Sequence, residues 1–260
     1  KLRYGDKEIK NFIKDYLQCS DSIAEAILDY FEEQYRYCKQ IPNDKLILIE
    51  HTVCDGKKKI VFHTIFGRRV NDCLSRAIAF VIGKLQHKNV EVGINDNGFY
   101  ICSEGKISIS SALNAINLEN FEKILSASIS KSEVFKRRFR HVAERALALI
   151  KKYKGVEKKV GRQELSSHFL LAILKRYNPK FFLIKEAKRE CLEDLMSIED
   201  AKKILKALKS DEIEIREIHT EFPSPFALNI VFQGYLDVLK IEDKAEFLKR
   251  AHQIILEKIK

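Results

Sequence analysis

Basic residues are concentrated in one part of the chain, between residues 136 and 162. This window holds eleven lysines and arginines against two acids, Glu144 and Glu157, so it carries a charge of +9 in a chain whose net charge is +10. Positive charge this localised favours a polyanionic partner such as nucleic acid. The candidate contact residues in and beside this window are Arg137, Arg138, Arg140, Arg145, Lys151, Lys152, Lys158, Lys159, Arg162 and Gln163.

The apolar residues of the same region predict a helix over residues 132–153. They recur every three or four positions and form one buried stripe: Phe135, Phe139, Val142, Ala146, Leu149 and Tyr153. The helix dipole favours cations near a C-terminus, which accounts for Lys151 and Lys152 but not for the arginines of the first turns. The loop that follows, with Gly161 ahead of another predicted helix, adds backbone N–H groups to a possible anion site. An ordinary solvated face remains the alternative interpretation.

A second, smaller basic cluster lies where a predicted strand leads into a predicted helix, in the sequence FGRRVNDCLSR. Arg68, Arg69 and Asn71 are its candidates for contact with a phosphate backbone. The structural alternative is that one arginine pairs with a carboxylate, such as Asp72 or Glu50, and fixes this corner.

The hydrophobic pattern predicts an α+β fold, mainly helical, with a small antiparallel sheet. An N-terminal helix pair, two β-hairpins and a long helix form the first part, and the C-terminal half is helical apart from one strand. The predicted helices cover residues 6–17, 21–38, 68–88, 117–128, 132–153, 162–177, 182–195, 197–209, 224–235 and 242–259. The predicted strands cover residues 46–53, 60–66, 90–96, 98–103 and 212–222.

We divide the chain into an α+β part over residues 1–104 and a mainly helical part over residues 105–260 that carries the basic helix. A single compact unit is the alternative. The chain begins with Lys1, and its one methionine is Met196, so we expect it to be a piece of a longer protein.

Common catalytic and metal motifs are missing from the sequence. There is no P-loop, no H-E-x-x-H and no G-x-S-x-G, so we name no catalytic residue and no metal ligand. The six cysteines are scattered without a C-x-x-C pair, as expected of reduced thiols in a cytoplasmic protein. No apolar run approaches the roughly 18 residues that span a bilayer, so we expect no membrane partner.

Five motifs occur together and in a recognisable order: FGRRVNDCLSRA, FKRRFRHVAERALALIKKYKG, GRQELSSHFLL, EAKRECLEDLM and IHTEFPSPFA. In this order they resemble the C-terminal, DEAD/H-associated region of the large helicase-related (Lhr) family, of the archaeal type. Members of that family are superfamily 2 DNA/RNA helicases. The resemblance covers residues from about 40 to 260.

The resemblance implies a parent enzyme that hydrolyses ATP with Mg²⁺ and moves 3′ to 5′ along single-stranded DNA. Its motor domains would lie outside this chain, which itself holds no cofactor. The chain would be an accessory, monomeric part that contacts single-stranded DNA or an RNA:DNA duplex through the basic and polar residues named above. Any stacking on bases would fall to Phe or Tyr, since the chain has no Trp.

Two other interpretations stay open. The chain could brace the motor domains of the same polypeptide and have little affinity of its own for nucleic acid. It could also be an independent enzyme, such as a base-repair glycosylase or a nuclease, although no motif supports this. The sequence leaves the preference between DNA and RNA open.

Overall fold

A computed structural model describes residues 5–54, 56–103, 105–150, 152–153, 155–157, 159–232, 249 and 252–258. The chain forms two compact units, which are best described separately. The first lies within Lys1–Gly67, Glu91–Gly105 and Ile213–Lys260, and the second within Arg68–Val90 and Lys106–Glu212. Compactness alone does not show that a segment folds independently, so the boundary near residue 104 stays a prediction.

A five-stranded sheet forms the centre of the first unit, with the strand order β3-β4-β2-β1-β7. Strand β1 pairs antiparallel with β2, and β2 pairs antiparallel with β4. The last strand in the sequence, β7, pairs parallel with β1, with Leu46 opposite Glu214. The strands are β1 (Leu46–Cys54), β2 (Lys57–His63), β3 (Val90–Asn95), β4 (Gly98–Ser103) and β7 (Glu214–His219).

The α+β class predicted from the sequence is confirmed, and the sheet is mixed rather than wholly antiparallel. The exception is β7, which returns to the sheet after the whole second unit and lies at its edge. Its sequence, EIREIH, is rich in charged residues, and most of its residues are exposed. Charged side chains of this kind discourage edge-to-edge pairing with another sheet.

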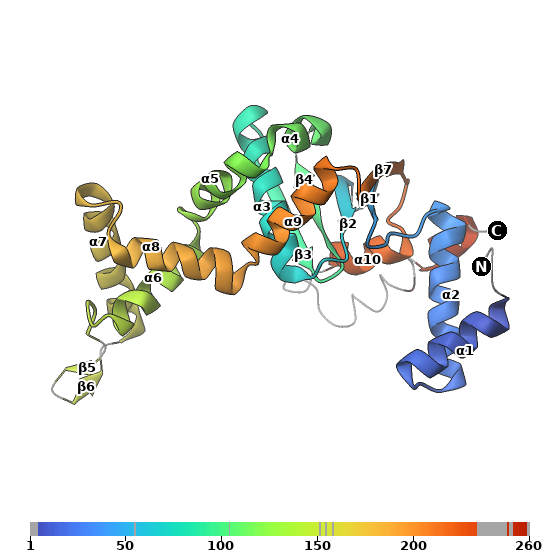
Figure 1. Cartoon of the computed structure of the whole chain (residues 1–260), viewed down its shortest axis with the longest axis horizontal. Coiled ribbons are helices and arrows are strands. Elements are labelled where there is room, and N and C mark those ends of the chain that lie inside the picture. The colour runs from blue at the N-terminus through green and yellow to red at the C-terminus, as the bar shows by residue number, and fades with distance from the viewer. Residues whose placement is uncertain are drawn as a thin grey trace. The chain divides into compact units, whose positions relative to one another are not determined.

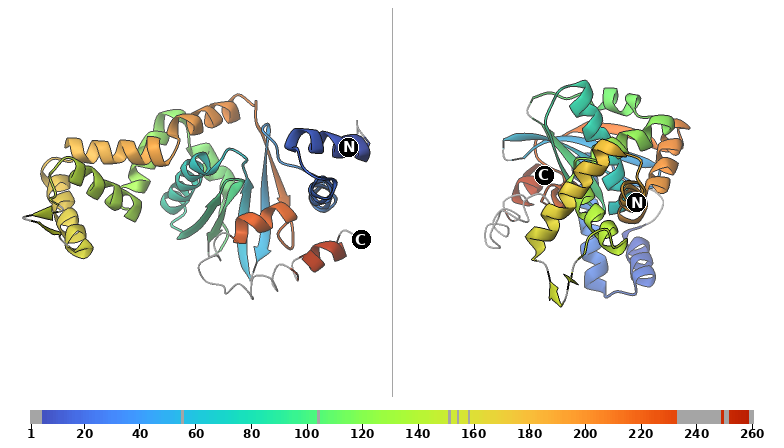
Figure 2. Two further views of the ribbon diagram at one scale, coloured as in Figure 1. Left: turned by 90° about the horizontal axis from the view of Figure 1, so that it is seen from below. Right: turned by 90° about the vertical axis from the view of Figure 1, so that its left-hand side faces the viewer.

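Helix α10 (Pro225–Phe232) packs against β2 and β4, as the left view of Figure 2 shows. Val61, Tyr100, Ile230 and Val231 are buried together in this layer. The turn before β4 needs glycine, because a Cβ atom on Gly98 would lie 2.1 Å from the carbonyl oxygen of Phe62. The backbone of the hairpin can therefore approach β2 and α10 closely.

The N-terminal helix pair is confirmed as α1 (Asp6–Leu17) and α2 (Asp21–Cys38), which pack on each other (Figure 1). The amide of Gly5 donates to the Glu8 carboxylate at the start of α1, at 3.1 Å. Tyr30 and Tyr37 of α2 donate their hydroxyls to the carbonyls of Pro225 and Phe222, at 3.0 and 2.9 Å. These bonds tie α2 to the segment that leads into α10.

The second unit is helical apart from one two-stranded hairpin. Helix α3 packs against α4, α5 and α9, and α6 packs against α7 and α8. Its elements are α3 (Arg68–Leu85), α4 (Ile109–Ala115), α5 (Leu118–Ile129), α6 (Glu133–Arg145), β5 (Lys152–Tyr153), β6 (Val156–Glu157), α7 (Val160–Tyr177), α8 (Phe182–Arg189), the π-helix η1 (Glu190–Leu195) and α9 (Ile198–Lys209).

Most predicted elements occur within a few residues of their expected places. Besides the early end of α6 and the unpredicted hairpin β5–β6, which belong to the region of the basic helix, three differences occur. Helix α4 has no predicted counterpart, although Ser108 caps it by accepting a hydrogen bond from the amide of Ser111. The helix predicted over 182–195 changes from α to π geometry at Glu190. Of the helix predicted over 242–259, residues 249 and 252–258 are helical, and the others lie outside the described residues.

Candidate nucleic-acid interface

The first three turns of the basic helix form as the sequence predicts. The hydroxyl of Ser132 accepts a hydrogen bond from the amide of Phe135 at 3.2 Å and caps α6. Phe135, Phe139 and Val142 are buried on one face, against α7 and α8. The cations therefore occupy the remaining arc of the helix, as an amphipathic pattern requires.

The predicted length of the basic helix, 132–153, is wrong, because α6 ends at Arg145. Leu147 adopts a left-handed backbone with φ 57°, and the amide of Leu149 bonds back to the carbonyl of Ala143 at 3.1 Å. The chain then forms the hairpin β5–β6, which turns at Gly155 with φ 82°. The turn after Arg145 ends the helix despite the high helix propensity of the Ala-Leu repeat, so Leu149 and Tyr153 lie outside α6 and do not extend its buried face.

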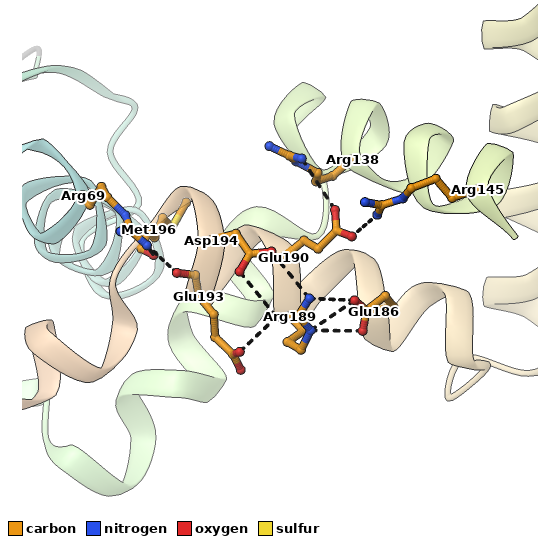
Figure 3. Close-up of polar contacts among 9 residues, drawn as sticks. All are labelled: Arg69, Arg138, Arg145, Glu186, Arg189, Glu190, Glu193, Asp194 and Met196. Carbon is orange, nitrogen blue, oxygen red and sulfur yellow. Dashed lines mark hydrogen bonds and ion pairs between the residues drawn. The ribbon is translucent and has the colours of Figure 1, made fainter.

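Two of the predicted contact residues, Arg138 and Arg145, face a buried carboxylate. The side chain of Glu190 is 4% exposed, and its Oε1 accepts a short hydrogen bond from Arg145 (Figure 3). Arg138 lies 3.6 Å from the other carboxylate oxygen, Oε2. A buried carboxylate without a cation is strongly destabilising, so these two arginines have a structural role in holding α6 to η1.

Arg69 has a similar structural role at the other end of η1. Its guanidinium donates to the backbone carbonyls of Glu193 and Met196, at 2.5 and 3.0 Å (Figure 3). Carbonyls at the end of a helix lack hydrogen-bond donors within the helix, and Arg69 of α3 provides the missing donors. The pairing of one arginine of this cluster with Asp72, the structural alternative, is made by Arg76 at 2.5 Å.

The acidic residues around η1 are also paired locally. Arg189 contacts Glu186 at 2.7 Å, Glu193 at 3.2 Å and Asp194 at 3.4 Å (Figure 3). The EAKRECLED motif is thus a compact ion-pair cluster joining α8 to η1.

The side chains of three further candidates are mostly or fully buried. Asn71 is 0% exposed in α3, and Gln163 is buried in the first turn of α7. Arg140 is mostly buried and lies 3.6 Å from the carboxylate of Glu164. A buried amide cannot reach a ligand at the surface unless its helix moves.

Four candidates remain exposed, and their side chains make no ion pair or hydrogen bond with another described residue. They lie on α6, on β5 and at the N-terminal end of α7, with β6 between the last two (Figure 1). Arg68 is exposed as well but is not without contacts, and Lys151 and Lys158 lie outside the described residues. The four exposed cations are Arg137, Lys152, Lys159 and Arg162.

Sequence reasoning missed a second apolar stripe on α7. Its members are exposed although they recur every four residues: Leu165, Phe169, Ile173 and Tyr177. The opposite face of α7 already packs against α6. The i, i+4 spacing was a visible signal, but periodicity alone does not distinguish a buried stripe from an exposed one.

The geometry shows little sign of catalytic chemistry. Among the residues that the structure describes, no three His, Cys, Asp or Glu side chains gather as metal ligands would. The six cysteines are free thiols, and burial raises the pKa of Cys73 to about 12, which makes it a poor nucleophile. None of the described helices could cross a bilayer.

Comparisons with known proteins agree with the predicted resemblance. The ATP-dependent helicase Lhr-Core of Methanothermobacter thermautotrophicus is 44% identical over the whole chain, and that of Sulfolobus acidocaldarius is 38% identical over 97% of it. The Lhr helicase/uracil glycosylase of Escherichia coli is 28% identical over 94% of the chain. The chain spans about 30% of the length of the two Lhr-Core proteins and 16% of the Escherichia coli protein.

The fold also has a counterpart of known structure. The Mycobacterium smegmatis helicase Lhr bound to ssDNA and AMP-PNP matches with a TM-score of 0.79 at 23% identity. The match covers 88% of this chain and 29% of that one. The sequence model of the DEAD/H associated family matches residues 41–227, and this chain therefore belongs to that family.

Proposed function

We propose that this chain is an accessory domain of an ATP-dependent helicase and that it contacts and guides single-stranded nucleic acid. ATP and Mg²⁺ would bind to motor domains elsewhere in the same polypeptide. The names of the relatives, ATP-dependent helicase Lhr-Core, support the helicase setting. The single observation that supports strand contact is the set of exposed cations Arg137, Lys152, Lys159 and Arg162.

The proposed surface is smaller than the sequence alone indicated. Glu190 offsets one of the two positive charges of Arg138 and Arg145, and Arg140 lies near Glu164. Among the residues whose side chains the structure describes, no carboxylate lies within ion-pair distance of the four exposed cations. A phosphate can therefore approach them without displacing an existing partner, which is the usual condition for salt-sensitive backbone binding.

Fluorescence anisotropy of the isolated chain with a labelled single strand, repeated across a salt series, tests this function. Four phosphate contacts predict a log–log slope of about −3, at about −0.7 for each contact on a single strand. The double variant Arg137→Gln, Arg162→Gln should reduce the slope by roughly 1.4. If wild-type protein shows no binding at low salt, strand guidance by this chain is wrong.

A matched control makes the same change of charge elsewhere in the second unit. Lys123 and Lys209 are exposed lysines on α5 and α9 that lie outside the basic window. The double variant Lys123→Gln, Lys209→Gln should keep the wild-type slope. An equal loss in both double variants would indicate that net charge, rather than this surface, governs binding.

A different observation favours a second function, that of a brace for the motor domains. Helices α1 and α2 border an apolar groove whose aromatic side chains are exposed, and the rings of Phe12 and Tyr16 stack at 5.8 Å. Exposed apolar patches of this kind mark sites of protein contact. The brace predicts that the remainder of the polypeptide, expressed separately, binds this chain and that Phe12→Ser with Phe31→Ser abolishes the binding.

A further inference from the structure

A small polar pocket lies between α6 and α7, on the side where the two helices pack together. Its volume is about 30 Å³, above the roughly 10–15 Å³ that one ordered water requires. Such a pocket admits one or two oxygen atoms of a ligand rather than a whole small molecule. Its walls are formed by Glu133, Lys136, Arg137 and Arg140 of α6 and by Glu164, Ser167 and His168 of α7.

A buried hydroxyl in this pocket has no partner. Ser167 is 1% exposed, and its Oγ makes no hydrogen bond with any described residue. Buried polar groups are nearly always hydrogen-bonded, because leaving a donor or acceptor unmet in the interior is unfavourable. The hydroxyl of Ser167 lacks a hydrogen-bond partner and lines a pocket large enough for an oxygen atom. This indicates that a group from outside the protein forms the missing hydrogen bond.

The charges around the pocket favour an anion as that group. Arg137 has no ion-pair partner among the described residues. Arg140 lies 3.6 Å from Glu164, which is beyond hydrogen-bond distance, and Glu164 is 55% exposed and can turn toward solvent. Two guanidinium groups therefore retain unused donors beside the Ser167 hydroxyl.

The ion pair of Glu133 and Lys136, also at the wall of the pocket, leaves the two arginines available to an incoming anion. Glu133 is already held by Lys136, at 2.5 Å. The His168 ring supplies a further nitrogen at the wall of the pocket. An oxyanion that displaces Glu164 from Arg140 would meet two arginines, which recognise tetrahedral oxyanions through paired N–H donors.

We propose that this pocket between α6 and α7 binds a phosphate group through Arg137, Arg140 and the hydroxyl of Ser167. The identity of the phosphate, a backbone phosphodiester of the guided strand, rests on the function proposed above. One phosphate held at a fixed point would set the register of the strand on the surface, whereas Lys152, Lys159 and Arg162 would contribute salt-sensitive attraction. Free inorganic phosphate offers the same chemistry and is the alternative source.

The test uses the full chain in two titrations followed by ¹⁵N-amide NMR, one with inorganic phosphate and one with a twenty-nucleotide single strand. Sodium chloride at matched ionic strength is the control titration. We expect the amides of Ser167 and His168 to shift with both ligands and not with chloride. Equal shifts of these amide signals with phosphate, the single strand and sodium chloride would contradict a phosphate site in this pocket.

Variants then separate the pocket from a general effect of charge. Ser167→Ala changes no charge and should weaken strand affinity roughly tenfold, as expected for the loss of one hydrogen bond to a charged acceptor. Arg137→Gln should weaken it about tenfold. Lys123→Gln, at an exposed position of α5, should change strand affinity less than twofold.

A structural role for Ser167 predicts a different pattern. Removal of a buried hydroxyl that lacks a partner should leave the melting temperature unchanged or raise it. Weaker strand binding with an unchanged or higher melting temperature therefore supports a ligand role, and a lower melting temperature with unchanged binding contradicts it. Glu164→Gln should strengthen phosphate binding, and Glu119→Gln on α5 is its matched control.

The results distinguish this inference from the proposed function. If wild-type protein binds the strand but Ser167→Ala and Arg137→Gln bind as tightly as Lys123→Gln, the pocket is wrong and strand guidance stands. If inorganic phosphate shifts the pocket amides but the strand does not bind, the phosphate site stands and strand guidance is wrong. If neither inorganic phosphate nor the single strand binds, both the phosphate site and strand guidance are wrong.

Discussion

Among the described residues, each compact unit contains one deeply buried glutamate, and the hydrogen-bonding needs of the two are met in different ways. Glu50, on β1, receives four hydrogen-bond contacts, from Thr220 at 2.8 Å, from the amide and hydroxyl of Ser224 at 2.7 and 2.6 Å, and from His63 at 2.9 Å. Glu190, in η1, is paired with two arginines, and its Oε2 has no hydrogen-bond partner among the described residues.

The partners differ in exposure as much as in number. His63 and Ser224 are themselves buried and Thr220 is half-buried, so most of the Glu50 network lies away from solvent. Arg138 and Arg145 are 30% and 62% exposed, so the charges that satisfy Glu190 also reach the surface. The first network can only support the fold, whereas the second lies at the edge of the surface proposed to guide a strand. A count of cations in the sequence therefore overstates the charge available to a ligand.

The largest expected effect follows from removal of Glu50. Glu50→Ala should reduce the free energy of unfolding by about 3–5 kcal/mol, because it leaves His63 and Ser224 buried without their acceptor. Urea denaturation followed by circular dichroism measures this loss. Glu50→Gln keeps the shape and one acceptor and should lose less. A loss below about 1 kcal/mol for the alanine variant would mean that the network contributes little to stability.

Removal of Glu190 should have a smaller effect on stability and an opposite effect on binding. Glu190→Ala should reduce the free energy of unfolding by about 1–3 kcal/mol, since the two arginines can still be solvated. It also releases Arg138 and Arg145, so affinity for a single strand should rise. Denaturation and anisotropy measure the two changes, with Glu119→Gln as the control for charge. Loss of stability without a gain in affinity would show that these arginines do not face the strand.

The contrast between the two glutamates also shows what could be read from the sequence. The strands of the five-stranded sheet, most helices and the buried face of α6 follow from local periodicity and were predicted, whereas the hairpin β5–β6 was not. The partner of Arg145 was not, because Glu190 lies 45 positions away and meets it only through tertiary packing. The signal was present in part, since Glu190 lies on the same helical face as the buried residues Leu183 and Ala187.

Two other differences have the same physical origin. The sequence predicts a strand near 212–222 but not its parallel pairing with β1. The two strands are separated in the sequence by the whole second unit, so no local pattern indicates that they pair. The Ala-Leu repeat after Arg145 has high helix propensity, yet the turn there ends the helix before the hairpin β5–β6. Local pattern predicts elements, whereas exposure and ion pairing depend on contacts between residues distant in the sequence.

The smallest of the three effects is the dependence of stability on pH through Glu50. Burial raises the pKa of Glu50, but hydrogen bonds from His63 and Ser224 outweigh burial and hold this pKa below its ordinary value of 4.5. The unfolded chain therefore binds a proton at a higher pH than the folded one, so this contribution is fully present above pH 4.5 and is lost as the pH falls through the lower, folded-state pKa.

Glu50→Gln removes the titrating group and should flatten this part of the stability curve. Urea denaturation of both proteins between about pH 3 and pH 6 measures the difference. Wild type and variant should differ most near pH 6 and converge as the pH falls. A constant difference across this range would show that the Glu50 network acts through its hydrogen bonds alone and not through the charge of the carboxylate.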